Sequence, residues 1–169
     1  MSGDVLARHA AFETGDVRIR PQHVGRDGYT TIAAFPMLVD EVMSDYSNTV
    51  VRTGWHHIDR LGQTGFVVDM RVQHIRALKL GDPVGFEFRV LDVDDKRWHA
   101  LTVMRHRIEG WTAGMQEQIN ICIDFATRRV APWIAESRDH LEALRALDAH
   151  RPWPMGFDRA LSLAALEVA

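Results

Sequence analysis

The chain changes its hydrophobic period at about residue 65, and the change separates a predicted helix from a predicted sheet. Before that point apolar residues recur every three or four positions, at Ile32, Phe35, Val39, Met43 and Tyr46. This is the spacing of one helical face. Thr30 or Thr31 could cap this helix. Pro36 predicts a start near Ala33 or a kink there, because proline is tolerated only in the first turn.

Beyond Gly65 apolar and polar residues alternate, which predicts strands. The first of these strands runs to about Leu78, with one face predicted to carry Phe66, Val68, Met70 and Val72. Three more follow over 84–90, 98–106 and 115–125, and turn residues separate them. Long consecutive strands with short turns form an antiparallel meander. A short strand over 16–21 and a helix over 131–148 complete the prediction.

This order predicts an α+β fold in which one twisted antiparallel sheet of about five strands wraps a central helix. We expect a single domain over 1–169. Its core covers about 16–146, with an N-terminal arm before it and a helical tail after it. One sheet face and edge would still need cover, so a homodimer or homotetramer is expected.

Composition narrows the function classes. The 169 residues carry 20 Lys and Arg against 23 Asp and Glu, a net charge of −3, which disfavours a nucleic-acid partner. No apolar run reaches the ~18 residues of a membrane span, and the N-terminus does not resemble a signal peptide. We therefore expect a cytoplasmic protein. The single cysteine, Cys122, lies in an apolar run and reads as a small buried residue.

Three segments carry a resemblance to a known family. The run Val72–Val84 resembles the second-strand-to-turn segment of 4-hydroxybenzoyl-CoA-thioesterase-like proteins, and Val93–His99 resembles their next hairpin. The segment Ile123–Trp133 is similar to the end of the fifth strand in the subgroup that includes betainyl-CoA thioesterases. The resemblance covers roughly 16–146 and implies the hotdog fold of acyl-CoA thioesterases.

The catalytic loop departs from the family pattern. Family members usually read Asp-x-x-Gly-His-x-Asn before the central helix, where this chain reads Gly25-Arg26-Asp27-Gly28-Tyr29-Thr30-Thr31. Gly28 is retained, whereas the aspartate, histidine and asparagine positions fall on Gly25, Tyr29 and Thr31. In the family the carboxylate attacks the thioester or activates water, and the helix N-terminus stabilises the oxyanion.

Asp27 is the nearest carboxylate that could replace the family aspartate, and a solvated turn aspartate is the alternative. Tyr29 or Thr31 could contact the thioester oxygen or a water. Asp40 and Glu41 lie in the middle of the apolar helix. One of them could be catalytic, or one could face an arginine and the other solvent or the dimer interface.

Basic residues near the strand ends are candidates for the coenzyme A phosphates, because guanidinium groups bind phosphate in a bidentate way. These candidates are Arg76, Lys79, Arg128 and Arg129. No metal or other cofactor is expected, since no Cys, His and Asp set has metal-ligand spacing. The histidines that could act as bases, but more often serve structural roles, are His23, His56, His57 and His74.

The sequence therefore predicts an acyl-CoA thioesterase that hydrolyses a short-chain or aromatic acyl-CoA to the free acid and coenzyme A. The alternative is a hotdog protein that binds an acyl-CoA or a similar ligand without turnover. The altered loop favours this alternative, because fold alone does not fix function. A hydratase would need an Asp and His pair around a loop, and no convincing pair is present.

Overall fold

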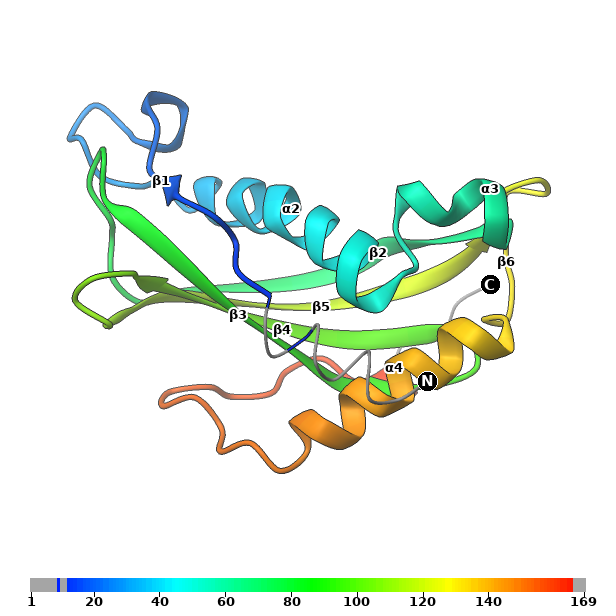
Figure 1. Ribbon diagram of the computed structural model, residues 1–169. Coiled ribbons are helices and arrows are strands. Elements are labelled where there is room, and N and C mark those ends of the chain that lie inside the picture. Colours follow the sequence, from blue (N-terminus) through cyan, green and yellow to red (C-terminus); the bar gives the residue numbers. More distant parts are fainter. Residues whose placement is uncertain (1–8, 10–11, 166–169) are drawn as a thin grey trace.

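An antiparallel sheet curls around helix α2 (Ala34–Tyr46), as Figure 1 shows. The computed structural model describes residue 9 and residues 12–165. The strand order is β1-β3-β4-β5-β2, and β6 pairs with β5. The predicted α+β hotdog arrangement is confirmed. The strands are β1 (Val17–Arg18), β2 (Gln63–His74), β3 (Pro83–Val93), β4 (Arg97–His106), β5 (Thr112–Asp124) and β6 (Arg129–Val130).

Helix α2 begins close to the predicted point, with Pro36 in its first turn, and continues into a π-helical turn, η2 (Ser47–Val51). The prediction of a threonine cap is wrong. Ala33 precedes the helix without a side-chain cap. The Thr30 hydroxyl instead accepts the backbone N–H of Leu78 at 3.0 Å, and the Thr31 carbonyl accepts the N–H of Ala34 at 3.1 Å.

Strand β2 contains a bulge that sequence alternation did not reveal. Its register against β5 shifts between Val67 and Asp69. Phe66 lies opposite Ile121, and Met70 lies opposite Gln118. These two partners are an odd number of residues apart, so they point to opposite faces of β5. The prediction that Phe66 and Met70 share one face is therefore wrong, because the bulge adds one residue to this strand.

The core lies between α2 and the concave face of the sheet. Phe35 is 1% exposed, and its ring lies 4.7 Å from the ring of His74. Phe35 packs directly on the backbone of β5 at Gly114. A Cβ on Gly114 would lie 2.1 Å from the Phe35 ring and 2.8 Å from the carbonyl oxygen of Gln73. The missing side chain at Gly114 thus sets how closely α2 approaches the sheet.

The remaining helices close the ends and edges of the sheet. Helix α4 (Ala135–Asp148) packs against β3, and its Leu141 and Leu144 join the same core as α2. It begins four residues later than predicted, after Pro132. Short helical turns are η1 (Pro21–His23), η3 (Trp55–His57), α3 (Ile58–Leu61) and η4 (Leu163–Ala165). No helix in the described ranges is long and apolar enough to cross a membrane.

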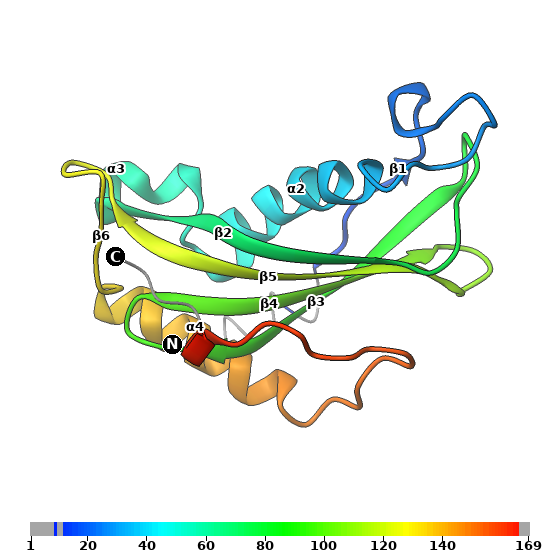
Figure 2. The ribbon, with the colours of Figure 1, turned by 180° about the vertical axis from the view of Figure 1, so that it is seen from behind.

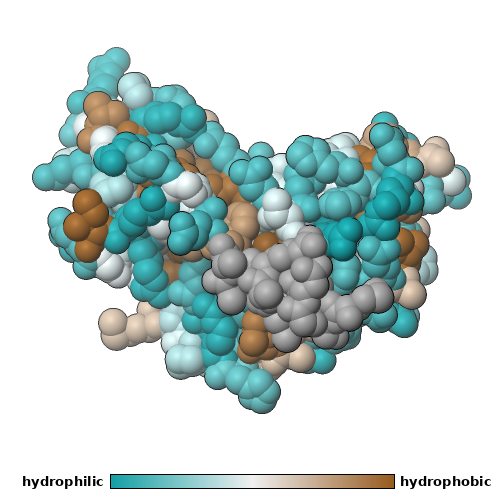
Figure 3. Space-filling model, in the orientation of Figure 1, coloured by the Kyte–Doolittle hydropathy of each residue, from teal (hydrophilic) through white to brown (hydrophobic). Residues whose placement is uncertain are grey.

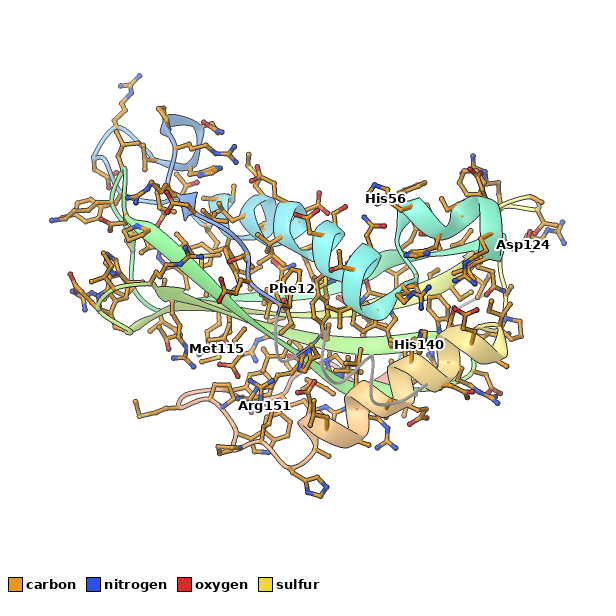
Figure 4. All side chains as sticks on the ribbon, viewed as in Figure 1. Phe12, His56, Met115, Asp124, His140 and Arg151 are labelled. Atoms are coloured by element: carbon orange, nitrogen blue, oxygen red, sulfur yellow. The ribbon has the colours of Figure 1, made fainter. Side chains whose placement is uncertain are left out.

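The C-terminal segment covers the convex face of the sheet, and this cover was not predicted. Phe157 packs on a small apolar cluster that includes Met115. The buried carboxylate of Glu117 accepts the N–H groups of Ala160 and Leu161, each at 3.0 Å. In Figure 4 the segment leaves α4 near Arg151 and passes below Met115. Of the predicted terminal helix, only η4 lies within the described residues, and the predicted arm lies mostly outside them.

The contact between Phe35 and Gly114 predicts a large effect of one methyl group. Gly114→Ala should lower the free energy of unfolding by about 1–3 kcal/mol or more, because the new Cβ collides with a ring and a backbone carbonyl. Gly85→Ala is the control, since a Cβ on this β3 glycine meets only Arg107, at 3.9 Å. The control should change stability by less than ~1 kcal/mol. Urea denaturation of both variants measures this difference, and equal stabilities would contradict the packing described.

Candidate active site

The loop of residues 25–31, which precedes α2, forms a compact turn. Gly25 donates its N–H to the carbonyl of Tyr29 at 2.9 Å, and Gly28 donates to the carbonyl of Gly25 at 3.0 Å. Gly28 has a φ of 80°. This left-handed backbone favours glycine over any residue with a Cβ, which gives a physical reason for the glycine at this position of the family pattern.

A second segment holds this loop in place. The N–H of Thr30 donates to the carbonyl of Leu78 at 2.8 Å, and the N–H of Leu80 donates to the carbonyl of Gly28 at 3.2 Å. Tyr29 also forms a β-bridge with Lys79. The loop is therefore tied by its backbone to the segment between β2 and β3, and changes in its exposed side chains leave these bonds in place.

The carboxylate of Asp27 occupies the space beside Gly25. A Cβ on Gly25 would lie 3.2 Å from Oδ1 of Asp27 and 3.7 Å from Cγ2 of Thr31. The same Oδ1 accepts the N–H of Tyr29 at 3.1 Å, and Asp27 is exposed. The loop thus brings a carboxylate next to Gly25, the position at which the sequence resemblance predicts the family aspartate.

The N-terminus of α2 presents free backbone donors beside this loop. The N–H groups of Ile32 and Ala33 have no hydrogen-bond acceptor among the described residues. Both residues are exposed. Unpaired N–H groups at the start of a helix carry a partial positive charge and stabilise a nearby anion. An oxyanion formed next to Thr31 would be within the reach of this effect.

Of the predicted phosphate-binding residues, two lie near the loop and two do not. The Lys79 ammonium lies 5.7 Å from the centre of the Tyr29 ring, and the Arg76 guanidinium stacks on Trp111 at 4.1 Å. Arg128 ends the turn that follows Asp124, and Arg129 begins β6. Figure 4 labels Asp124 at the end of the molecule opposite the loop, so within one protomer these four residues do not form one site.

The two helix carboxylates, Asp40 and Glu41, are both exposed. Glu41 forms an ion pair with Arg20, whereas Asp40 lines a cleft described below. The prediction that one carboxylate would face an arginine is confirmed for Glu41. Its charge is already matched, which leaves Asp40 as the helix carboxylate next to a possible ligand.

The four histidine candidates are held in four different ways. His23 is buried, and its Nδ1 accepts the N–H of Arg20 at 3.1 Å. Burial and the nearby Arg20 charge lower the pKa of His23, so it is neutral at pH 7. His57 contacts the carbonyl of Asn48 at 2.7 Å, and His74 packs on Phe35. His56 is exposed at the surface beside η2, as Figure 4 shows. No cluster of three potential metal ligands occurs among the residues searched.

A cleft that the sequence analysis missed lies between the second half of α2 and strand β2. Its volume is about 130 Å³. Figure 3 shows the upper surface hollowed between the end of the molecule that carries the loop and the end that carries α3. The cleft is lined by Asp40, Met43, Ser44, Ser47, Thr53, Gly54, Trp55, Thr64, Gly65, Val67, Trp98 and Asn120.

One sequence signal could have revealed the cleft. Gln116, Gln118 and Asn120 occupy alternate positions of a predicted strand whose second half is mostly apolar. All three side chains point to the concave face, where α2 lies, and all are buried. Polar side chains on the buried face of a strand need partners, and such an exception to the apolar pattern marks a candidate site.

Comparison with known proteins places the chain in a family. The profile of the Thioesterase-like superfamily matches residues 20–141. The chain belongs to this superfamily. The match spans most of the sheet, α2 and the loop before it. No curated protein sequence matches the chain, and the resemblance to the betainyl-CoA subgroup stays a prediction.

Solved structures of similar fold agree with this assignment. A hypothetical protein from Staphylococcus aureus, solved in complex with CoA, has a TM-score of 0.72 and 18% identity, with 89% of this chain and 96% of that chain covered. A putative thioesterase from Pseudomonas putida has the same score and identity, over 90% and 97% of the two chains. The DHNA-CoA thioesterase of Staphylococcus aureus has a TM-score of 0.69 and 14% identity, over 79% and 91%. At these identities the likeness establishes the fold of this thioesterase-like protein and leaves its substrate open.

Cys122 is buried in the core, as the sequence predicted, and burial raises the pKa of its thiol to about 12. The thiolate is the reactive form. We therefore expect no reaction of the native protein with a thiol-detecting disulfide reagent at pH 8, and one equivalent of reaction after unfolding in guanidinium. Stoichiometric reaction of the native protein within minutes would show that the core is open. Because an unreactive Cys122 gives no background signal, the same reagent can then measure released coenzyme A.

Proposed function

We propose that this thioesterase-like protein hydrolyses a short-chain or aromatic acyl-CoA to the free acid and coenzyme A, with Asp27 in place of the usual loop aspartate. The observation that carries the proposal is the position of the Asp27 carboxylate. Its Oδ1 lies 3.2 Å from the point where a Cβ of Gly25 would stand. A carboxylate from two positions further along the turn thus lies beside the space that a side chain on Gly25 would occupy.

In the proposed reaction, Asp27 accepts a proton from a water molecule as the water oxygen attacks the thioester carbon. The carbonyl oxygen becomes an oxyanion, which the N–H groups of Ile32 and Ala33 stabilise. The tetrahedral intermediate then collapses with cleavage of the carbon–sulfur bond. The proton on Asp27 returns to the leaving coenzyme A thiolate. Gly28 shapes the turn, and Tyr29 and Thr31 border the reacting group.

The edge of the sheet supports a homodimer as the working unit. Strand β2 lies beside β5 and pairs with no other described strand, as Figure 2 shows. It exposes three apolar side chains, Val67, Val68 and Met70, which are 41%, 45% and 47% exposed. A long apolar edge strand with unpaired backbone groups favours pairing with another chain. Two copies joined through β2 would form one continuous sheet, and two such dimers could form a tetramer.

Such a dimer would also bring the separated basic residues together. Antiparallel pairing of β2 with its copy places the Gln63 end of one strand beside the His74 end of the other. Arg128 and Arg129 lie near the Gln63 end, since β6 and β2 flank the same end of β5. The basic turn of one protomer would then lie at the same end as the loop of the other. Together with Arg76 and Lys79 it would hold the coenzyme A phosphates.

A second candidate function is the binding of an acyl-CoA or similar ligand without turnover. The hydrogen bond from the Tyr29 N–H to Asp27 favours it, because this bond gives the carboxylate a structural role in the turn. Under this alternative the loop still presents helix N–H groups to a carbonyl or an anion, but water is not activated.

The test is coenzyme A release from a panel of acyl-CoAs by the parent protein and three variants. Asp27→Asn should reduce kcat about 10²–10⁴-fold, because it removes the proton acceptor. The double variant Gly25→Asp with Asp27→Asn should recover part of this loss, because it returns a carboxylate to the family position. Asp139→Asn is the control, since this exposed carboxylate lies on α4, which packs against β3, away from the loop and from the β2 edge.

The outcomes separate the two functions. Release that survives Asp27→Asn would refute the catalytic role of this carboxylate and turn attention to Asp40. Binding of an acyl-CoA in a calorimetric titration, without release by any protein of the series, would establish the ligand-binding function instead.

The dimer proposal has its own test. Val68→Lys should shift the protein from dimer to monomer in sedimentation velocity at micromolar concentration, because a charge on the edge strand blocks pairing. Ile108→Lys is the matched control, since Ile108 is 80% exposed but lies in the turn after β4. A parent protein that sediments as a monomer, or a Val68→Lys variant that stays dimeric, would contradict the proposed interface.

A further inference from the structure

The floor of the cleft between α2 and β2 contains two donors without acceptors. The indole Nε1 of Trp98 and the side-chain Nδ2 of Asn120 have no hydrogen-bond partner in the part of the chain that the structure describes. Trp98 is 2% exposed and Asn120 is 5% exposed. A buried donor left unpaired destabilises the folded state by about 1–3 kcal/mol. Two such donors in one cleft are a costly feature unless a ligand pairs with them.

The two donors lie side by side. Trp98 of β4 is directly opposite Asn120 of β5 in the sheet register, so their side chains share the concave face. The Asn120 oxygen already accepts a hydrogen bond from Gln118 at 3.3 Å, and Gln118 in turn accepts one from Gln116 at 2.8 Å. These hydrogen bonds use the Asn120 oxygen, so the Asn120 NH₂ group is the part of the amide that remains for a ligand in the cleft. An indole N–H can only donate, so this floor requires an acceptor.

Gly65 opens the space above the indole. A Cβ on Gly65 would lie 3.7 Å from Nε1 of Trp98 and 3.6 Å from the ring of Trp133. Both are ordinary van der Waals distances, so an alanine would fit without a clash. It would nevertheless fill the space through which a ligand atom reaches the indole N–H. Gly65 itself lines the cleft.

The rest of the lining selects the kind of acceptor. Asp40 is the one charged side chain among the described lining residues, and hydroxyl groups come from Ser44, Ser47, Thr53 and Thr64. The negative charge of Asp40 disfavours a ligand carboxylate. A neutral oxygen fits both the floor donors and this charge. The small volume of the cleft, about 130 Å³, favours a short acyl group.

We propose that this cleft binds the acyl group of the substrate through a neutral hydroxyl or keto oxygen, so that the preferred substrates are short hydroxyacyl- or ketoacyl-CoA thioesters. The inference rests on the proposed thioesterase function and names its substrate class. The cleft lies at the Gln63 end of β2. In the proposed dimer this end meets the loop of the other protomer, so an ester held at that loop extends its acyl group into the cleft. Trp98 and Asn120 are specificity-determining residues there.

The test compares two substrates that differ by one oxygen, butyryl-CoA and 3-hydroxybutyryl-CoA. The parent protein should show a kcat/KM at least tenfold higher for the hydroxy ester, the difference that corresponds to about 1.4 kcal/mol for one neutral hydrogen bond. Trp98→Phe removes the N–H and should reduce this ratio to within about threefold of one. Gly65→Ala should do the same by covering the indole, and Gly85→Ala is the control that should keep the parent ratio.

The same four proteins are titrated with both esters by calorimetry, so that the inference is tested even without turnover. If no ester is hydrolysed but the hydroxy ester binds tenfold more tightly in a Trp98-dependent way, the proposed function fails and the cleft assignment stands. Equal kcat/KM values and equal affinities for the two esters would overturn the assignment. A preference for the hydroxy ester that survives both Trp98→Phe and Gly65→Ala would also overturn it. The same holds if neither ester binds, or if the protein prefers the carboxylated ester succinyl-CoA to the hydroxy ester.

Discussion

The packing of Phe35 on Gly114 is the constraint on which the site depends. The ring fills the space where any residue other than glycine at position 114 would place its Cβ, which would lie 2.1 Å from the ring. This close approach fixes the N-terminal end of α2 against the concave face of the sheet. The loop of residues 25–31 is joined to that end of the helix and tied by backbone bonds to the segment near Leu78. A glycine and a phenylalanine, neither of which contacts a ligand in this account, thus determine where the helix N–H groups point.

The backbone and the side chains of the 25–31 loop contribute differently to the proposed site. The backbone forms the turn at Gly28, the N–H groups before α2 and the bonds to the neighbouring segment. Most substitutions at exposed positions of the loop leave these backbone features unchanged. A catalytic carboxylate is different, because it must reach one place in space. In the proposed reaction Asp27 supplies this carboxylate from a position two residues after Gly25, because the tight turn brings its side chain beside Gly25. The proposed function rests on this local geometry rather than on the fold, which supports many activities.

The sequence predicted the elements that follow a strict period, and it failed where local backbone events intervene. Helix α2 and the strands of the meander follow from apolar spacing. The bulge in β2 adds one residue and exchanges the faces of Phe66 and Met70, and alternation carries no sign of it. Thr30 and Thr31 are good caps by residue type, yet Thr30 bonds to Leu78, a partner distant in sequence. Asp27 was a candidate from its position in the loop, whereas its closeness to Gly25 required the fold. The cleft depends on three strands and a helix that meet only in space, so the sequence analysis placed Trp98 only at the start of the strand predicted over 98–106.

The most direct test of the central claim is a crystal structure of the protein with a ketone analogue of butyryl-CoA, in which a methylene group replaces the thioester sulfur. The account predicts that the ketone oxygen lies within hydrogen-bond distance of the Ile32 or Ala33 N–H, with the Asp27 carboxylate facing the carbonyl carbon. An analogue that binds with its ketone group away from the 25–31 loop would contradict the account.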